Sequence, residues 1–170
     1  GFLNMNGGRI REALHDLTGA PAITYFTREG RPEEHWNNII DGDRRHYIMA
    51  AGTDDISGTG NDAFNDKVGL SGNHAYSLLA AYEIINDRGN KRVLREGEPS
   101  NPNNERIVKL RNPWGEKEWK GDWSDNSSKW TPQLRNEVKI KNEEDGIFCM
   151  PFADFTDFIA PMIFTARSDV

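Results

Sequence analysis

The sequence predicts an α+β fold that is built mainly from antiparallel strands, with a few helices at its periphery. Short apolar segments rich in β-branched and aromatic residues alternate with polar stretches that contain turn-forming residues. Segments with the helical spacing of apolar residues are fewer. The 170 residues are enough for one domain with its own core, so we expect a single domain over residues 1–170.

Three segments have the pattern of a helix. In residues 10–18 the apolar side chains are spaced as on one face of an amphipathic helix, which Gly19 would end. A second helix is predicted over residues 32–40, beginning at a proline and with acidic residues in its first turn. Residues 152–158 carry phenylalanine at every third position, which predicts a short helix on the sheet.

Strands are predicted where apolar residues run continuously or alternate with polar ones. These segments are residues 22–27, 47–51, 75–85, 106–111, 138–140, 146–150 and 163–166. Between them we expect a loop over residues 52–69, a broken or extended hairpin over residues 87–104 and a tryptophan-rich loop over residues 113–130.

The composition excludes several classes of protein. The formal net charge is -6, which disfavours a nucleic-acid partner because such a partner requires a basic face. No apolar run approaches the roughly 20 residues of a membrane span. Cys149 is the only cysteine, so no internal disulfide can form, and we expect a cytoplasmic location. Residues 1–10 lack the pattern of a signal peptide and are interpreted as a linker.

The first candidate for chemistry is the sequence GNHAYS at residues 72–77. Within it, His74 stands between a loop that contains glycine and a long apolar strand. A histidine at the start of a strand is held by a rigid element and is well placed to act as a general base. The structural alternative is a histidine that only ends a strand.

The second candidate is the sequence RNPWG at residues 111–115. Asn112 ends a predicted strand, and Pro113 fixes the turn that follows. An asparagine side-chain oxygen can accept a hydrogen bond from an imidazole and so fix its tautomer and orientation, as in a Cys-His-Asn set. Trp114 could lie over that contact and exclude water, which would strengthen it. The alternative is an Asx-type turn followed by a core tryptophan.

Together the two segments resemble the second subdomain of the calpain catalytic core. That family has a GHAYS-type histidine segment followed by an RNPWG asparagine segment, and here His74 and Asn112 are 38 positions apart. Further matches keep the same order: DLTG at residues 16–19, E-W-x-G-x-W-S-D at 118–125, Trp130, EDGIF at 144–148, Met150 and FADF at 152–155. The resemblance covers about residues 11–158.

The resemblance implies a papain-like β subdomain, with a preceding subdomain of the same full-length protein supplying the nucleophilic cysteine. His74 would deprotonate that cysteine and later protonate the leaving amine, while Asn112 would orient His74. Trp114 would shield their contact, and in the family it also blocks the cleft when calcium is absent. Gly72 and Asn73 would border the substrate cleft, and because the family has glycine before its histidine, the Asn73 side chain would narrow that cleft.

Two further segments bear on the resemblance. Residues 51–60 resemble, with little identity, the flexible loop at the edge of the family's cleft. Cys149 is not expected to be the nucleophile, since it follows His74 and Asn112 whereas the papain-like order places cysteine first. Its apolar neighbours within a predicted strand would also raise the thiol pKa and make it inert. His15, His35 and His46 receive no role.

Acidic residues suggest a calcium site, which is the one cofactor that the resemblance implies; no organic cofactor is expected. The positions that match the family's calcium ligands are Glu118, Asp125 and Asp145, with the backbone carbonyl of Glu143. Calcium takes 6–8 oxygen ligands, which loops distant in sequence can supply. The family has a glutamate where this chain has Ile147, so the site is weakened or absent, and the alternative is a set of solvated acidic loops.

Three functional hypotheses remain. The first is the histidine- and asparagine-bearing half of a calcium-dependent intracellular cysteine endopeptidase, which is inactive alone and acts on protein or peptide substrates. The second is a non-catalytic calpain-like module that binds peptides or regulates a partner. The third ignores the resemblance and treats Trp119, Trp123 and Trp130 as an exposed platform on which a ligand stacks.

Overall fold

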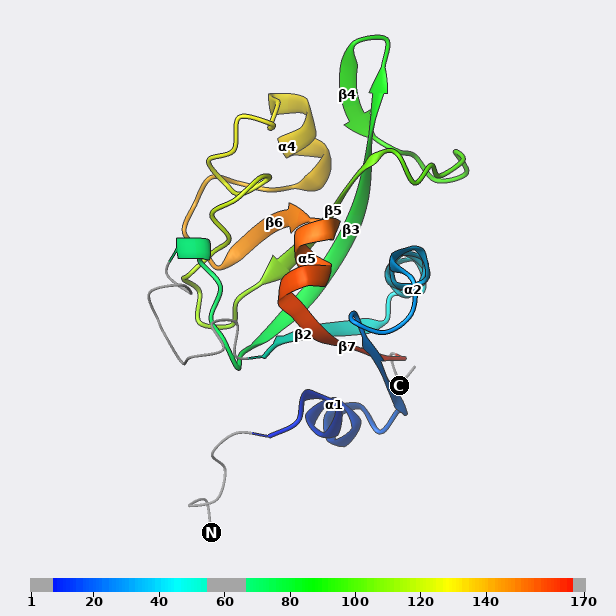
Figure 1. Cartoon of the computed structure of the whole chain (residues 1–170), viewed down its shortest axis with the longest axis vertical. Coiled ribbons are helices and arrows are strands. Elements are labelled where there is room, and N and C mark those ends of the chain that lie inside the picture. Colours follow the sequence, from blue (N-terminus) through cyan, green and yellow to red (C-terminus); the bar gives the residue numbers. More distant parts are fainter. Residues whose placement is uncertain (1–7, 55–66, 167–170) are drawn as a thin grey trace.

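One antiparallel sheet organises the chain (Figure 1), and the computed structural model describes residues 8–54 and 67–166. The strands are β1 (Ala22–Phe26), β2 (Ile48–Thr53), β3 (Ala75–Asp87), β4 (Asn90–Val93), β5 (Glu105–Arg111), β6 (Ile147–Pro151) and β7 (Ile159–Thr165). Their order is β1-β7-β2-β3-β5-β6, and β4 pairs with the end of β3. The predicted α+β class with a mainly antiparallel sheet is confirmed.

The described helices are α1 (Ile10–Thr18), α2 (Pro32–Arg44), α4 (Pro132–Val138) and α5 (Phe152–Phe158). Helices α1 and α2 lie on opposite faces of the β1–β7–β2 part of the sheet. The Thr18 hydroxyl of α1 lies 3.4 Å from that of Thr165, whereas Gly42 of α2 packs closely against Phe164. Since neighbouring residues of a strand point to opposite faces, the two helices cover opposite sides.

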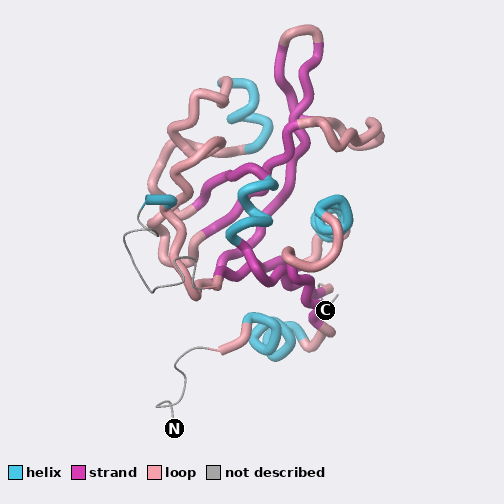
Figure 2. Tube along the Cα trace, in the orientation of Figure 1, coloured by secondary structure: helices cyan, strands magenta, loops and turns pink. Residues whose placement is uncertain are grey.

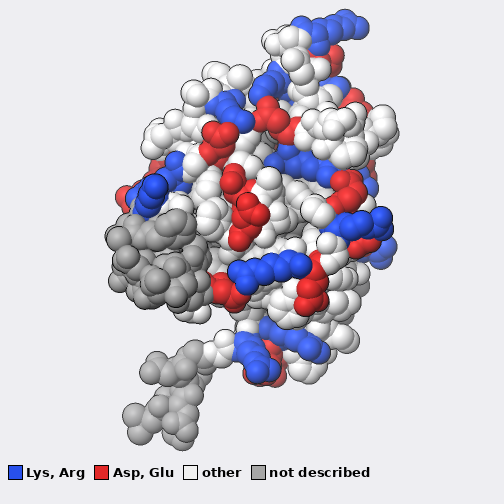
Figure 3. Space-filling model, in the orientation of Figure 1, with Lys and Arg blue, Asp and Glu red and all other residues white. Residues whose placement is uncertain are grey.

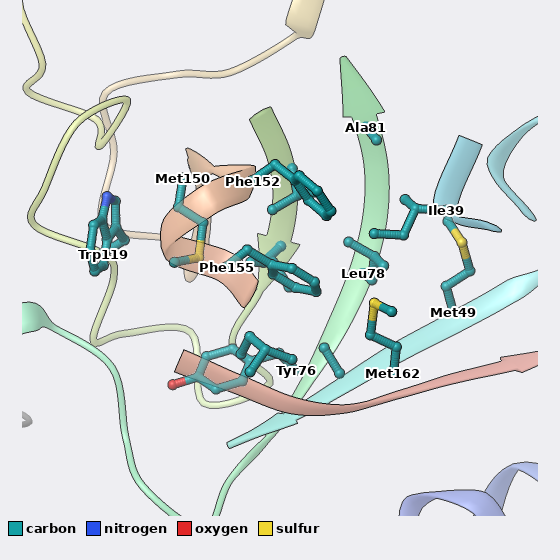
Figure 4. Close-up of a cluster of buried hydrophobic side chains, with 14 of the residues drawn as sticks. Ile39, Met49, Tyr76, Leu78, Ala81, Trp119, Met150, Phe152, Phe155 and Met162 are labelled. Atoms are coloured by element: carbon teal, nitrogen blue, oxygen red, sulfur yellow. The ribbon is translucent and has the colours of Figure 1, made fainter. Parts of the chain in front are cut away.

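Two clusters of buried side chains stabilise this arrangement. The larger one lies between the sheet and helices α2 and α5, and includes Ile39 of α2 and Phe155 of α5 (Figure 4). The smaller one includes Trp123, Trp130 and Leu134, and packs α4 and the loop before it against β5 and β6. Each large apolar side chain that is buried in this way contributes about 1.5–3 kcal/mol.

Strand β3 is the longest strand and connects the two halves of the sheet, because it pairs with β2 on one side and β5 on the other. A β-bulge interrupts the β3–β5 ladder: Leu78 and Ala80 pair with successive residues of β5, and Leu79 has no partner in it. Before the bulge, Ser77 pairs with Arg111. The first residues of β3 therefore lie beside the last residues of β5.

The strand predicted over residues 138–140 is wrong. Val138 is the last residue of α4, and Lys139 after it is left-handed, with φ 54°. Thr131 caps this helix, since its hydroxyl accepts the N–H of Leu134 at 3.1 Å, and a proline follows it at the first helical position. This start signal and the burial of Val138 outweigh the local strand pattern.

Other boundaries differ less. Strand β2 extends through Thr53, which was assigned to the predicted loop over residues 52–69, and β7 begins at Ile159 rather than at Ile163. The predicted hairpin is present as β3 and β4, with its turn at Arg88 and Gly89. Residues 1–7 of the predicted linker lie outside the described residues, and Ile10, its last residue, already belongs to α1. Residues 55–60 of the predicted cleft-edge loop also lie outside the described residues. The single domain over residues 1–170 stays a prediction.

The tryptophan-rich segment 113–130 contains no helix or strand, as predicted (Figure 2). Its indoles, however, do not form an exposed platform. Trp119, Trp123 and Trp130 are at most 9% exposed, and each indole N–H donates to an oxygen of the chain. The hypothesis of a stacking platform is therefore wrong, because these residues are part of the core.

Candidate active site

The sheet brings His74 and Asn112 together. His74 directly precedes β3, and Asn112 directly follows β5. Because these two strands are antiparallel neighbours, the beginning of one lies beside the end of the other. His74 Nε2 lies 2.8 Å from Asn112 Oδ1, so the two residues that the sequence singled out are in hydrogen-bond contact.

The Asn112 amide makes four contacts, three of which fix its orientation. Its Oδ1 accepts the backbone N–H of Trp114 at 3.0 Å in addition to the contact with His74. Its Nδ2 donates to the carbonyls of Glu116, at 2.6 Å, and Lys117, at 3.2 Å. Since the side chain is completely buried, reversing the amide would turn its NH2 group toward the N–H of Trp114 and its oxygen toward the two carbonyls, without solvent to compensate; these three contacts fix the orientation without any assumption about His74.

This orientation determines which nitrogen of His74 carries the proton. Asn112 presents an oxygen to Nε2, so Nε2–H donates and, in the neutral ring, Nδ1 keeps its lone pair. The imidazole thus has one nitrogen held by the protein and one able to accept a proton. This is the arrangement required of a general base with an orienting partner.

Aromatic rings hold the imidazole on two sides. The Trp114 ring lies over His74 with centroids 4.0 Å apart, and the rings of Tyr76 and His74 form a T-shaped pair, with centroids 5.0 Å apart and an interplanar angle of 88°. Trp114 is 59% exposed whereas Tyr76 is buried. Trp114 therefore covers the pair from the solvent side, and Tyr76 supports it from the core.

The turn that carries Asn112 and Trp114 packs tightly against the loop before β6. The N–H of Asn112 donates to the carbonyl of Gly146 at 2.8 Å. Gly146 has φ 81°, and a Cβ atom there would lie 2.6 Å from the carbonyl oxygen of Asn112 and 2.8 Å from Cα of Gly115. A glycine is thus needed both for the backbone conformation and for the close approach.

A cleft of about 600 Å³ is lined by residues that contact the His74–Asn112 pair, namely Trp114, Glu116 and Lys117. Its lining also includes Gly72, Glu118, Asp125 and Glu143. Of the predicted cleft residues, Gly72 thus lines this space. The other one, Asn73, is exposed and left-handed, with φ 49°, in the turn before His74.

The predicted metal ligands are partly brought together. Oε1 of Glu118 accepts the backbone N–H groups of Asp145, at 3.0 Å, and Gly146, at 2.7 Å. Oδ2 of Asp125 accepts the N–H of Glu143 at 3.2 Å, while its Oδ1 is buried and has no hydrogen-bond partner. These residues therefore lie on adjoining loops around one region.

The electrostatics of this region are those of crowded carboxylates. Burial, and then the charges of Glu118 and Asp145, raise the pKa of Asp125 to about 6. Burial, and then the charges of Asp145 and Glu144, also raise the pKa of Glu118. Within residues 8–54 and 67–166, however, no three His, Cys, Asp or Glu side chains form a group that could hold a metal ion.

Cys149 lies within β6, in the smaller hydrophobic cluster and away from His74. It is completely buried, and burial raises the pKa of its thiol to about 12. The expectation that Cys149 is a buried, unreactive thiol agrees with this environment. Sequence reasoning gave no role to Thr53, which bonds to the backbone of His74, because it assigned that residue to a loop.

Basic and acidic side chains are interspersed on the face shown in Figure 3, without a continuous basic area. Among the described helices, none is long and apolar enough to cross a membrane.

A histidine whose Nε2–H is held by a buried amide, at the rim of an antiparallel sheet, is an arrangement that nucleophilic hydrolases of the Cys-His-Asn type use. Residues 1–163 match the family model described as calpain family cysteine protease. The chain therefore belongs to the calpain family of cysteine proteases, as the resemblance of its motifs indicated.

Individual relatives agree. The calpain-1 catalytic subunit of Bos taurus is 34% identical over 154 residues, which cover 89% of this chain and 19% of that protein. The human calpain-1 catalytic subunit is 33% identical, with the same two coverages. The calpain-type cysteine protease DEK1 of Arabidopsis thaliana is 28% identical over 159 residues, which cover 89% of this chain and 6% of that protein. The chain thus spans a fifth or less of the length of these relatives.

Proposed function

We propose that this chain carries the general base and the orienting amide of a calcium-dependent cytoplasmic cysteine endopeptidase. A cysteine from an upstream part of the same full-length protein would supply the nucleophile, and protein or peptide chains would be the substrates. The observation that supports this most is the contact of His74 Nε2 with Asn112 Oδ1, with the amide orientation fixed by three other hydrogen bonds.

In this mechanism Nδ1 of His74 takes the proton of the upstream thiol, and the thiolate attacks the carbonyl carbon of the scissile peptide bond. The imidazolium then gives that proton to the leaving amine as the C–N bond breaks, which leaves an acyl-enzyme thioester. Nδ1 next takes a proton from water as the water oxygen attacks the thioester carbonyl. The C–S bond then breaks, which releases the acid, and the imidazolium returns its proton to the sulfur. Asn112 holds the ring throughout, and Trp114 keeps water from their hydrogen bond.

The chain alone is proposed to be inactive. Its single thiol, Cys149, is completely buried, and its raised pKa keeps it protonated at neutral pH. A thiol in that state is neither accessible to a peptide nor nucleophilic. Hydrolysis by the isolated chain that survives Cys149→Ser but not His74→Ala would contradict the need for an upstream cysteine.

The decisive experiment compares the full-length protein with its His74→Ala variant on a fluorogenic peptide. Loss of the general base is expected to lower kcat/KM by about 10²–10⁴-fold or more. The matched control is His15→Ala, which removes an exposed histidine of α1 and should leave the rate unchanged. Equal hydrolysis by the wild type and by His74→Ala would show that the base is assigned wrongly.

The calcium part of the proposal rests on the crowded, partly buried carboxylates. The ion would be held by Glu118, Asp125 and Asp145 and by the carbonyl of Glu143. Asp125 offers a buried oxygen without a partner. Its pKa is raised first by burial and then by the charges of Glu118 and Asp145, and a bound cation would offset both effects. Ile147 supplies no oxygen, and the carboxylates would have to converge further, so we expect weak binding.

Calorimetric titration of the chain with calcium tests this part. We expect measurable heat and a rise in Tm at millimolar calcium, and neither effect in Asp125→Asn. Glu96→Gln is a control that removes one carboxylate from the loop after β4, outside this region. If the wild type shows no heat and no thermal shift, calcium does not bind, and the base assignment is unaffected.

The alternative is a non-catalytic calpain-like module that binds peptides. It is favoured by Asn73, which places a side chain where the family has glycine, and by the lack of an accessible thiol among the described residues. The two functions differ in the full-length protein. The alternative would show peptide binding without any hydrolysis, and His74→Ala would leave that binding intact.

A further inference from the structure

Thr53, the last residue of β2, binds the backbone of His74. Its N–H donates to the carbonyl of His74 at 2.9 Å, and the N–H of His74 donates to Thr53 Oγ1 at 3.1 Å. Both backbone polar groups of the candidate base are therefore held by one residue. Thr53 is 6% exposed, so water does not compete strongly for these bonds.

The same hydroxyl also holds the turn that leads into His74. Thr53 Oγ1 donates to the carbonyl of Ser71 at 2.6 Å, a shorter contact than its 3.3 Å approach to the carbonyl of His74. Because a hydroxyl can donate and accept at once, it links Ser71 and His74 to the end of β2. These are the two ends of the turn that contains Gly72 and the left-handed Asn73.

The other hydrogen bonds of this turn do not involve the N–H of His74. The N–H of Asn73 donates to the carbonyl of Asp54 at 3.0 Å, and the N–H of Ser71 donates to the Tyr76 hydroxyl at 2.8 Å. The Tyr76 ring also forms a T-shaped pair with the imidazole of His74. The Thr53 hydroxyl is thus the contact that fixes the His74 N–H itself, from which the direction of the side chain follows.

We propose that Thr53 is a positioning residue, whose hydroxyl keeps the His74 imidazole within hydrogen-bond distance of Asn112. A catalytic role for this positioning rests on the proposed function, whereas the hydrogen bonds of the Thr53 hydroxyl are observed in the structure. Valine has the shape of threonine but can neither donate nor accept. In Thr53→Val, the N–H of His74 and the carbonyl of Ser71 would lose their shared partner in a buried place, so the turn would shift and carry the imidazole with it.

The test is NMR spectroscopy of the ¹⁵N-labelled chain, which needs no catalytic activity. In the wild type and in Thr53→Ser, which keeps the hydroxyl, the ring nitrogens of His74 should report the Nε2–H tautomer with a protected proton. In Thr53→Val that proton should exchange at least about tenfold faster, or its signal should be lost. Thr53 pairs with Ile159, the first residue of β7, and the control is Thr165→Val, a buried threonine at the last position of β7, which should leave the His74 signals unchanged.

Each outcome decides the proposal. Wild-type His74 signals in Thr53→Val, or their loss in Thr53→Ser, would overturn it. If Thr53→Val does not fold, Thr53→Ala is measured in its place, because it cannot overpack the site. If Thr53→Val and Thr53→Ala both fail to fold, the hydroxyl is needed for the stability of the sheet, and the positioning role is overturned. Failure of the proposed function would appear elsewhere, as hydrolysis by the full-length protein that is insensitive to His74→Ala.

Discussion

Replacing Gly146 by alanine should destabilise the chain through two separate effects. At φ 81° an L-residue is in the left-handed region, which costs about 1–2 kcal/mol. The new Cβ would also lie 2.6 Å from the carbonyl oxygen of Asn112 and 2.8 Å from Cα of Gly115, which are backbone atoms that cannot move aside. Overpacking of this kind costs typically about 1–3 kcal/mol more.

Gly89 provides the matched control for this prediction. It has φ 89° in the turn between β3 and β4, and a Cβ there would meet no atom within 4 Å. Gly89→Ala should therefore show the conformational cost alone. The free energy of unfolding of Gly146→Ala should be lower than that of Gly89→Ala by about 1–3 kcal/mol, which is large against a total of about 5–15 kcal/mol.

Urea denaturation followed by tryptophan fluorescence measures both variants and the wild type under one set of conditions. A second readout is the Nε2–H signal of His74, which Gly146→Ala should perturb, since the carbonyl that the methyl group displaces belongs to Asn112. Equal losses of stability in Gly146→Ala and Gly89→Ala, with His74 unchanged, would refute the argument that backbone crowding at Gly146 shapes the site.

Three further predictions concern single side chains. The pKa of Asp125 is about 6 in the folded chain and close to its ordinary value of 3.8 in the unfolded chain, so the folded state binds the proton more tightly. Without calcium, the free energy of unfolding should therefore fall as the pH rises from about 4 to about 6, and Asp125→Asn should remove about 1–2 kcal/mol of that fall in urea titrations. Trp114→Ala should change the stability by less than about 1 kcal/mol, because the side chain is 59% exposed, yet speed the solvent exchange of the His74 Nε2–H seen by NMR. Iodoacetamide should leave Cys149 unmodified in the folded chain at neutral pH and modify it in urea; rapid labelling of the folded chain would contradict the buried thiol.

The elements that the sequence predicted well are those with strong local signals. Helix α2 begins at Pro32, and β3 coincides with the long apolar run after His74. The meeting of His74 and Asn112 was inferred from the resemblance of their two motifs. The sheet explains it physically, since one residue precedes and the other follows a pair of antiparallel neighbours.

The features that were missed depend on contacts between distant parts of the chain. The burial of Trp123 follows from its packing against Trp130 and β5, which no local pattern reports. Thr53 was assigned to a loop because the following residues are turn formers, whereas its pairing with the His74 segment extends β2. The acidic loops were identified by motif, but the raised pKa of Asp125 depends first on its burial and then on the approach of Glu118, and only the fold provides either.

The bulge at Leu79 determines how far His74 reaches along β5. If Leu79 entered the ladder opposite Leu110, every earlier residue of β3 would slide by one position, about 3.3 Å, and the contact with Asn112 would break. The bulged register keeps Leu78 buried and leaves Leu79 40% exposed, so apolar packing several residues away sets the alignment. A related chain could keep both motifs and still lose the contact between His74 and Asn112, because that contact also depends on the register between β3 and β5, which the bulge sets.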